Sequence, residues 1–312
     1  MIAASHLTKS YADCKAVNDV SFTVKQGECV GLLGLNGAGK TTLLRMLACL
    51  LAPTAGTARI GEADISVDSI AVRGRIGFLP EEPPLYGEMR VRDFLAFAAR
   101  LRGVAKGDLA ERVDRAISRC RLGDVEQQRI ETLSYGFKKR VGIAQAIVHQ
   151  PPLVLLDEPI AGLDPAQIVE MRDLIRALRG QHTLLLSSHI LHEISQTCDR
   201  ILVMHRGQVA AQGTEEELTG KLGSKLRIRL DAAGSRGALE KALGGLEGLE
   251  AIEIEARPED RLSAELVCSR DLRRDAARAV VEAGLGLEVL TLLRGDLESV
   301  FLKLTGPREA ES

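Results

Sequence analysis

The sequence predicts an α/β domain followed by a smaller α+β domain. A strand, a glycine-rich loop and a helix follow one another around residue 40. Further apolar runs end in polar residues, as buried strands of a parallel sheet do. After about residue 220 the pattern changes to short alternating segments separated by helical spacings. The 312 residues are enough for about two domains.

The composition limits the classes of function. Hydrophobic residues make up 45% of the chain and charged residues 27%, so a full core and a polar surface are both available. The formal net charge of −2 argues against a dedicated nucleic-acid-binding protein. No apolar run reaches the roughly 20 residues of a membrane span. We therefore expect any action on a membrane to occur from its surface or through a partner chain.

The first elements in the chain are two strands. Short, partly alternating apolar segments over residues 2–7 and 16–24 predict an antiparallel edge. Tyr11 is expected in the loop between them. Lys25 to Gly27 then form a turn into a third strand, predicted from the apolar run over residues 29–33.

A phosphate-binding loop follows this third strand. Its motif is G-x-x-x-x-G-K-[ST], and helical spacing from Thr42 to Ala48 supplies the strand–loop–helix context that the motif requires. The loop consists of Gly34, Leu35, Asn36, Gly37, Ala38, Gly39, Lys40, Thr41 and Thr42. Its glycines allow backbone N–H groups to point at phosphate oxygens, and the helix N-terminus adds partial positive charge.

Two side chains of the loop suit a nucleoside triphosphate with Mg²⁺. Lys40 can pair with the β- and γ-phosphates, and Thr41 offers a hydroxyl group to the metal ion. We therefore expect nucleotide binding rather than a glycine-rich turn that binds nothing. Tyr11 then has two interpretations, which stay open: stacking on the nucleotide base, or packing within its loop.

The next segments combine a strand, a loop and several helices. Residues 75–79 predict a strand that runs into a proline-rich loop with Glu81, at the kind of strand end where α/β folds bind ligands. Helical spacing then indicates an inserted helical subdomain over about residues 88–150. Within it, Ser134 is predicted to cap a helix, and Gly136 permits close approach at the helix start.

Two central strands end in candidate catalytic residues. The apolar run over residues 153–156 ends in Asp157 and Glu158, which strand alternation is expected to place on different sides. Asp157 can hold Mg²⁺, directly or through water, and Glu158 can orient a water molecule. A second buried strand, over residues 183–187, leads to His189, which we expect to contact the γ-phosphate.

The remaining chain divides into the end of the first domain and a second domain. A hairpin and a short acidic helix close the first domain, which we assign to residues 1–220. The second domain, residues 225–312, follows the order β-α-β-β-α-β, which is ferredoxin-like. A terminal amphipathic helix is predicted from Asp296 to Leu304. The second domain carries no catalytic pattern, and its role stays open.

Together, these motifs resemble those of the ATP-binding subunits of ABC transporters. The resemblance covers about residues 2–218 and is nearest to the group that powers drug, polysaccharide and gliding-motility exporters. It implies a P-loop NTPase domain with a mixed sheet core, an antiparallel β edge and a helical subdomain. In this family Tyr11 would stack on adenine, residues 34–42 would be Walker A, residues 153–158 Walker B, and residues 161–164 the D-loop.

At other motif positions this sequence has different residues from those typical of the family. Glu81 stands at the Q-loop in place of glutamine, where it can still reach Mg²⁺ or a water molecule. Residues 133–137 stand at the LSGGQ signature, with Tyr135 for the first glycine and Phe137 for the glutamine. His189 would be the switch histidine. Walker A and Walker B are intact, so the resemblance implies both ATP binding and ATP hydrolysis.

The resemblance also implies partners. Two ATP-binding subunits, as a homodimer or a heterodimer, would sandwich two ATP molecules between Walker A of one and the signature of the other. Ser134 and Gly136 would then contact the γ-phosphate across the interface. Integral membrane permease subunits on separate chains would hold the protein at the cytoplasmic face of the membrane. No nucleic acid is expected as a partner.

Three other classes of function agree less well with the sequence. A soluble ABC-type ATPase acting on a nucleic-acid or ribosomal complex usually has a coiled-coil insertion or a second cassette. Here Lys40 and Leu133 lie fewer than 100 residues apart, and one cassette is present. A non-hydrolysing ATP-binding regulator is disfavoured by the intact Glu158 and His189, although the altered signature favours it. A phosphate-loop kinase or GTPase would not need the signature, Glu158 and His189 segments together.

Overall fold

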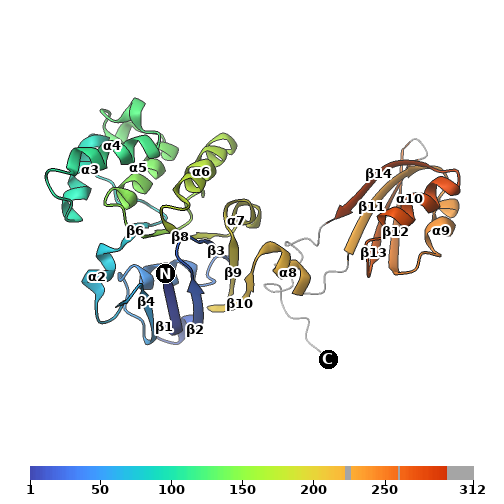
Figure 1. Ribbon diagram of the computed structural model, residues 1–312, viewed down its shortest axis with the longest axis horizontal. Coiled ribbons are helices and arrows are strands. Elements are labelled where there is room, and N and C mark those ends of the chain that lie inside the picture. Colours follow the sequence, from blue (N-terminus) through green and yellow to red (C-terminus); the bar gives the residue numbers. More distant parts are fainter. Residues whose placement is uncertain (222–225, 259–260, 294–312) are drawn as a thin grey trace. The chain divides into compact units, whose positions relative to one another are not determined.

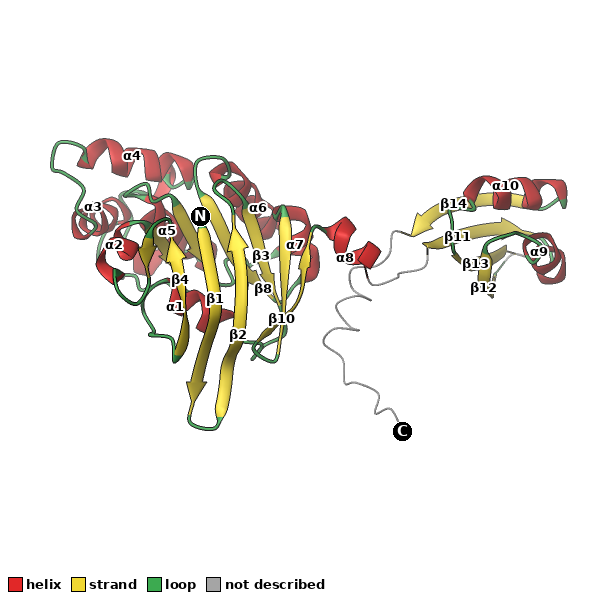
Figure 2. Cartoon of the chain, turned by 60° about the horizontal axis from the view of Figure 1, so that its bottom comes forward, coloured by secondary structure: helices red, strands yellow, loops and turns green. Residues whose placement is uncertain are grey.

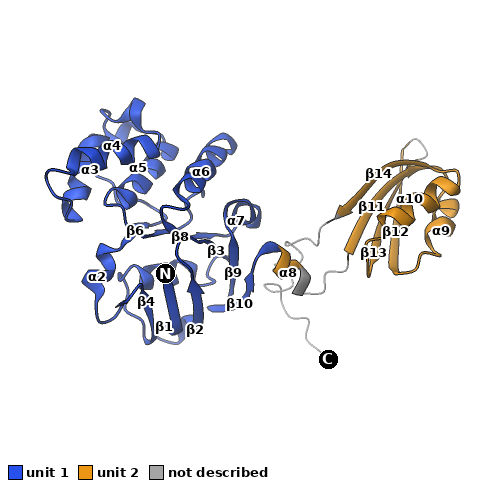
Figure 3. Cartoon of the chain, in the orientation of Figure 1, with its two compact units in different colours: residues 1–215, 307–312 blue, residues 216–306 orange. Residues whose placement is uncertain are grey.

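The computed structural model describes residues 1–221, 226–258 and 261–293, which form two compact units. The first unit covers Met1–Glu215 and the second begins at Glu216 (Figure 3). Most of their elements are labelled in Figure 1. The terminal helix predicted from Asp296 to Leu304 lies outside the described residues.

The first unit contains a four-stranded antiparallel sheet and a six-stranded mixed sheet. The antiparallel sheet has the order β2-β1-β4-β5, and its long strands are visible in Figure 2. Its strands are β1 (Ile2–Tyr11), β2 (Cys14–Val24), β4 (Ala55–Ile60) and β5 (Ala63–Asp64). The predicted antiparallel β edge is therefore present.

The mixed sheet has the order β10-β9-β3-β8-β7-β6. All its neighbouring strands run parallel except β10, which is antiparallel to β9. Its strands are β3 (Cys29–Leu33), β6 (Ile76–Leu79), β7 (Leu153–Leu156), β8 (Thr183–Ser188), β9 (Arg200–His205) and β10 (Gln208–Gly213). Every residue of β3, β6, β7 and β8 is buried, as their continuous apolar runs predict.

Helices follow the strands of the first unit. They are α1 (Lys40–Leu47), α2 (Ser69–Gly74), α3 (Val91–Leu101), α4 (Leu109–Arg119), α5 (Tyr135–Ile147), α6 (Pro165–Leu178) and α7 (Leu191–Thr197), with 3₁₀ turns at Gly123–Val125 and Ile130–Thr132. Helices α3, α4 and α5 pack against one another within the predicted helical subdomain (Figure 1). Ser134 caps α5 as predicted, because its Oγ accepts a hydrogen bond from the Phe137 N–H at 3.4 Å.

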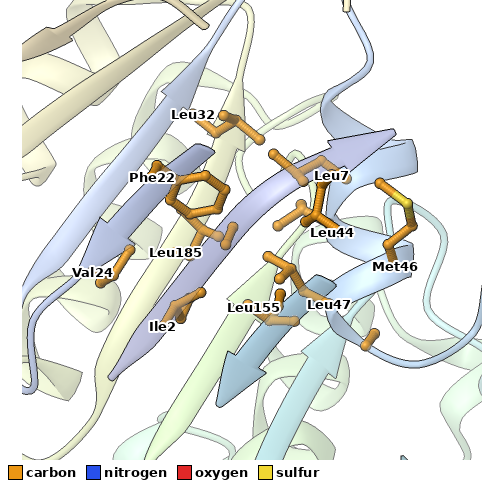
Figure 4. Packing of buried hydrophobic residues seen from close by; sticks show 14 of the residues in the cluster. Ile2, Leu7, Phe22, Val24, Leu32, Leu44, Met46, Leu47, Leu155 and Leu185 are labelled. Carbon is orange, nitrogen blue, oxygen red and sulfur yellow. The ribbon is translucent and has the colours of Figure 1, made fainter. Parts of the chain in front are cut away.

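The helix that follows the phosphate-binding loop packs into a hydrophobic cluster between the two sheets. Figure 4 shows Leu44, Met46 and Leu47 of α1 among side chains from both sheets, including Phe22 and Leu185. Each of these α1 side chains is fully buried, and each such burial stabilises the fold by about 1.5–3 kcal/mol. The first residue of α1 is Lys40, so this packing fixes the end of the loop relative to the sheet.

The second unit contains a four-stranded antiparallel sheet with the order β12-β13-β11-β14. The chain order is β11, α9, β12, β13, α10, β14, which is β-α-β-β-α-β. These elements are β11 (Leu226–Ala233), α9 (Arg236–Leu243), β12 (Leu249–Arg257), β13 (Arg261–Cys268), α10 (Arg273–Glu282) and β14 (Gly286–Leu293), and α8 (Glu215–Lys221) precedes them. Leu239 and Val280 of the two helices join the buried residues of the sheet in one cluster.

Candidate functional site

A cavity of about 450 Å³ opens at the carboxyl ends of the central strands. The residues that line it come from separate segments of the first unit. They are Ala16, Asn36, Gly37, Ala38, Gly39, Lys40, Thr41, Thr42, Glu81, Glu158 and His189. The parallel register accounts for this convergence, since Leu33 pairs with Ser188 and Leu156 pairs with Leu186. The residues that follow these three strands are therefore neighbours.

The phosphate-binding loop needs glycine at its last turn. Gly39 has a φ of 101°, and a Cβ atom there would lie 2.3 Å from the Ala16 carbonyl oxygen. Both the left-handed backbone and the contact with β2 exclude other residues. Gly37 also has a positive φ, of 81°. The glycines of the motif are therefore needed for the backbone conformation of the loop as well as for the approach of a ligand.

Lys40 lies in the wall of the cavity with its ammonium group held on several sides. Its Nζ donates hydrogen bonds to the carbonyl oxygens of Gly34 at 2.8 Å and Leu35 at 3.3 Å. It also lies 3.4 Å from Oε1 of Glu158, and both side chains are more than nine-tenths buried. The ammonium is thus placed between the loop and the acidic strand end.

Asp157 contacts the loop at Thr41, the residue after Lys40. Its Oδ1 accepts hydrogen bonds from Ser187 Oγ at 2.7 Å and from Thr41 Oγ1 at 3.2 Å. Its Oδ2 is buried and has no hydrogen-bond partner among the described residues. Burial raises the pKa of this carboxyl group and the charge of Glu158 raises it further, whereas the two hydroxyl donors oppose the shift.

Glu158 corrects one expectation from the sequence. Strand alternation predicted that Asp157 and Glu158 would lie on different sides, but β7 ends at Leu156 and Glu158 has a φ of 46°. This left-handed backbone turns the Glu158 side chain back toward the loop. Both acids therefore reach the phosphate-binding loop, although their partners differ.

His189 completes a chain of contacts across the cavity. Its Nδ1 lies 3.0 Å from Oε2 of Glu158, whose Oε1 faces Lys40. The His189 ring is 42% exposed, so it can contact both the carboxylate and a ligand in the cavity. Glu81, from the proline-rich loop, is exposed and lines the same cavity.

Six of the predicted site residues are not among those that line this cavity. Gly34, Leu35 and Asp157 bond to lining residues, namely Lys40 and Thr41, and the other three are Tyr11, Ser134 and Gly136. Tyr11 was expected in a loop, but it is the last residue of β1 and pairs with Cys14, because the turn between β1 and β2 is shorter than predicted. Its half-exposed ring lies beneath Lys9 Nζ, 5.4 Å from the ring centroid. Ser134 and Gly136 stand at the start of α5, and a Cβ atom at Gly136 would meet the Gln167 side chain.

Sequence reasoning missed three residues of the site. Ala16, from β2, lines the cavity beside the loop. The Ser187 Oγ donates a hydrogen bond to Asp157 and accepts one from the Glu158 N–H at 2.9 Å. Lys139 is a buried lysine in α5 whose Nζ donates to the carbonyl oxygens of Glu81 and Glu158. Ser187 could have been found from its place at the end of a buried strand. Lys139 lies in a polar run and gave no such signal.

Two further features are absent from the described part of the chain. No group of three or more His, Cys, Asp or Glu side chains there could hold a metal ion by itself. None of the helices there is long and apolar enough to cross a bilayer.

The chain is similar to known proteins across both units. A sequence model of the ABC transporter family matches residues 17–161. An uncharacterised ABC transporter ATP-binding protein of Bacillus subtilis (strain 168) is 41% identical over 219 residues, which are 70% of this chain and 72% of the relative. A daunorubicin/doxorubicin resistance ATP-binding protein of Streptomyces peucetius is 37% identical over 310 residues, 98% of this chain and 92% of the relative.

A solved structure supports the same assignment. The ATP-binding subunit of an ABC transporter superposes with a TM-score of 0.65 at 30% identity, covering 72% of this chain and 93% of that chain. The chain therefore belongs to the family of ABC transporter ATP-binding proteins. It is an ATP-binding and ATP-hydrolysing subunit of a membrane transporter.

Proposed function

We propose that the cavity binds the phosphates of ATP and that Glu158 and His189 carry out its hydrolysis. The observation that carries this proposal is the chain of contacts from Lys40 through Glu158 to His189. Lys40 pairs with the β- and γ-phosphates, while Glu158 positions the attacking water molecule. His189 holds that water and the γ-phosphate in line. The loop N–H groups from Gly34 to Thr42 surround the phosphates.

We further propose that Thr41 and Asp157 hold Mg²⁺. The fit rests on the unpartnered, buried Oδ2 of Asp157 and on the Thr41 hydroxyl group beside the same carboxylate. Mg²⁺ commonly uses one or two protein oxygen ligands together with phosphate oxygens and water. When bound, it would neutralise charge that develops on the phosphate oxygens. Glu81 lines the same cavity and can bind the ion or a water molecule near it.

The predicted residues outside the cavity contact other parts of the nucleotide or a nucleotide on a second subunit. Tyr11 stacks on adenine, and its exposed ring at the end of β1 is available for that contact. Ser134 and Gly136 lie outside the cavity of their own chain, which supports contact with the nucleotide held by a second subunit. Residues 1–220 carry these functions, and residues 225–312 form an accessory domain.

The transporter is an exporter in this proposal. The relative from Streptomyces peucetius is named for resistance to daunorubicin and doxorubicin, and its similarity extends across both units of this chain. A drug is therefore the favoured class of cargo. The protein works at the cytoplasmic face of the membrane, where permease subunits on separate chains hold it.

The substitution Glu158→Gln tests the catalytic proposal. It removes the charge that orients water but keeps the size of the side chain and the loop that binds phosphates. We expect ATP affinity within about threefold of normal and a fall in kcat of at least about 100-fold. Steady-state ATPase assays and titration with a fluorescent ATP analogue would measure the two quantities on the full chain.

A matched control is Glu82→Gln, which changes an exposed acid next to the cavity-lining Glu81. Its kcat should stay within about twofold of normal. If Glu158→Gln retained normal turnover, Glu158 would lose its proposed role and hydrolysis would need another base.

A further inference from the structure

Lys139 is the one buried lysine of α5, and its surroundings are unusual for a cation. Its side chain is 0% exposed, whereas a lysine is almost never fully buried unless it is paired. In the described part of the chain its ammonium has no carboxylate partner within ion-pair distance. Its hydrogen-bond acceptors are the main-chain oxygens of Glu81, at 2.6 Å, and Glu158, at 3.1 Å.

These two acceptors belong to different walls of the nucleotide cavity. Glu81 comes from the loop after β6, and Glu158 comes from the end of β7; both line the cavity. A single ammonium group therefore joins the two walls. The Tyr135 ring covers the group, with Lys139 Nζ 5.5 Å from the ring centroid. The same ring lies close to the left-handed Gly162, in the turn that follows Glu158.

The contact of Lys139 with Glu158 is made to a residue whose backbone has an unfavourable conformation. Glu158 has a positive φ of 46°, a conformation that persists in a non-glycine residue only when surrounding contacts hold it. Its N–H donates to Ser187 Oγ at 2.9 Å, and its carbonyl oxygen accepts from Lys139. Both main-chain groups of the residue are thus held, and its carboxylate lies between Lys40 and His189.

We infer that Lys139 is a positioning residue for ATP hydrolysis, which orients the Glu158 carboxylate by holding the main-chain oxygens of Glu158 and Glu81. This inference rests on the proposed role of Glu158. Burial of an uncompensated cation opposes stability, and it lowers the pKa of Lys139, although the charges of Glu81, Asp157, Glu158 and Glu82 partly offset the effect. An apolar side chain at this position would stabilise the fold at least as well as a buried lysine, so stability alone does not explain Lys139.

The test replaces Lys139 with Met in the full chain, which keeps the approximate length of the side chain and removes the donor. We expect kcat to fall about 10- to 100-fold, because a small displacement of a water-orienting group is costly. The Kd for a fluorescent ATP analogue should stay within about threefold, since Lys139 does not line the cavity. If Lys139 instead contributed to phosphate binding, the Kd would rise. If it contributed only to folding, the Tm would fall without a separate effect on kcat. Either result would overturn the inference.

The matched control is Lys138→Met, on the same helix. Lys138 also donates to a main-chain oxygen, that of Glu131 at 3.1 Å, but neither residue lines the cavity. Its kcat should change by less than about twofold. Equal losses of kcat in the two variants would overturn the inference, as would a normal kcat in Lys139→Met.

Failure of this inference can be distinguished from failure of the proposed function. If Glu158→Gln abolishes turnover and Lys139→Met leaves kcat normal, only the inference on Lys139 falls. If Glu158→Gln retains turnover, the proposed function falls first. Should Lys139→Met not fold, Lys139→Gln takes its place in the same assays. A lower kcat with normal Kd then supports the inference, and a normal kcat overturns it.

Discussion

At the scale of single residues, the two adjacent acids of the site have different environments. Asp157 accepts from two hydroxyl groups but leaves one buried oxygen without a partner in the described structure. Glu158 instead faces Lys40 and His189. Burial raises the pKa of Asp157, and the charge of Glu158 raises it further, while the Ser187 and Thr41 hydroxyl groups oppose the shift. These different environments support the proposal that Asp157 holds Mg²⁺ and Glu158 orients a water molecule.

A second residue-scale property is the neutral state of His149. Its Nε2 lies 3.1 Å from the Ile76 carbonyl oxygen, and burial, reinforced by the charge of Arg102, lowers its pKa to about 4. The unfolded chain binds a proton below pH about 6.5, whereas the folded chain does not until pH about 4. His149 therefore contributes stability above this range, and the contribution is lost as the pH falls through it.

Substituting His149→Gln should reduce this dependence on pH. The amide can donate to the Ile76 oxygen but cannot bind a proton in the unfolded chain. We expect the loss of unfolding free energy between pH 6.5 and 4 to be smaller by up to roughly 3 kcal/mol, as measured by urea denaturation at several pH values. His192→Gln, at an exposed histidine, is the control. Equal slopes for the normal chain and His149→Gln would contradict the assignment.

At the scale of elements, α5 lies directly on β6 because glycine stands at the contact. A Cβ atom at Gly77 of β6 would lie 2.0 Å from the Ala146 carbonyl oxygen of α5. A second close approach occurs at Gly142 of α5, where a Cβ atom would meet Leu79 and Pro83. The helix that begins with the signature is thereby held against the strand that leads to Glu81. This packing links the helical subdomain to the cavity.

Gly77→Ala should disrupt that packing. The clash is with the backbone of α5, which cannot move away as a side-chain end could, so we expect a loss of about 3 kcal/mol or more of unfolding free energy. Gly74→Ala is the control, because a Cβ atom there would meet nothing within 4 Å and its φ is not positive. Its Tm should stay the same or rise slightly. A Tm for Gly77→Ala equal to that of the control would contradict the close approach.

At the scale of the whole molecule, two separate cores support two units. A hydrophobic cluster of the first unit gathers residues of both sheets around α1, and the cluster of the second unit gathers β11–β14 with α9 and α10. The clusters share no residue. The nucleotide cavity draws all its lining residues from the first unit. Stability and ligand binding are therefore expected to be separable.

Differential scanning calorimetry of the full chain should reveal two unfolding transitions. Mg²⁺–ATP at about 100 times its Kd should stabilise the first unit by about 2.7 kcal/mol and raise the temperature of one transition. The other transition should not move. In Lys40→Ala, which lacks the phosphate-binding ammonium, neither transition should respond to nucleotide. Movement of both transitions in the normal chain would indicate that the units unfold together.

Much of the fold and part of the site could be predicted from contiguous residues. Continuous apolar runs identified β3, β7 and β8, and the glycine and lysine spacing identified the loop from Gly34 to Thr42. The order of elements in the second unit followed from alternation and helical spacing. These features depend on periodicity within a short segment, which the sequence displays directly.

By itself, the sequence determined the class of the protein, the phosphate-binding loop and the acids at the end of β7. Only the tertiary structure decided that Glu158 turns back toward Lys40, that Ser187 supports both acids, and that Lys139 is buried beside the cavity. Each of these depends on contacts between segments far apart in the chain. Backbone conformation and burial at such contacts are set by packing, and local residue patterns do not encode them.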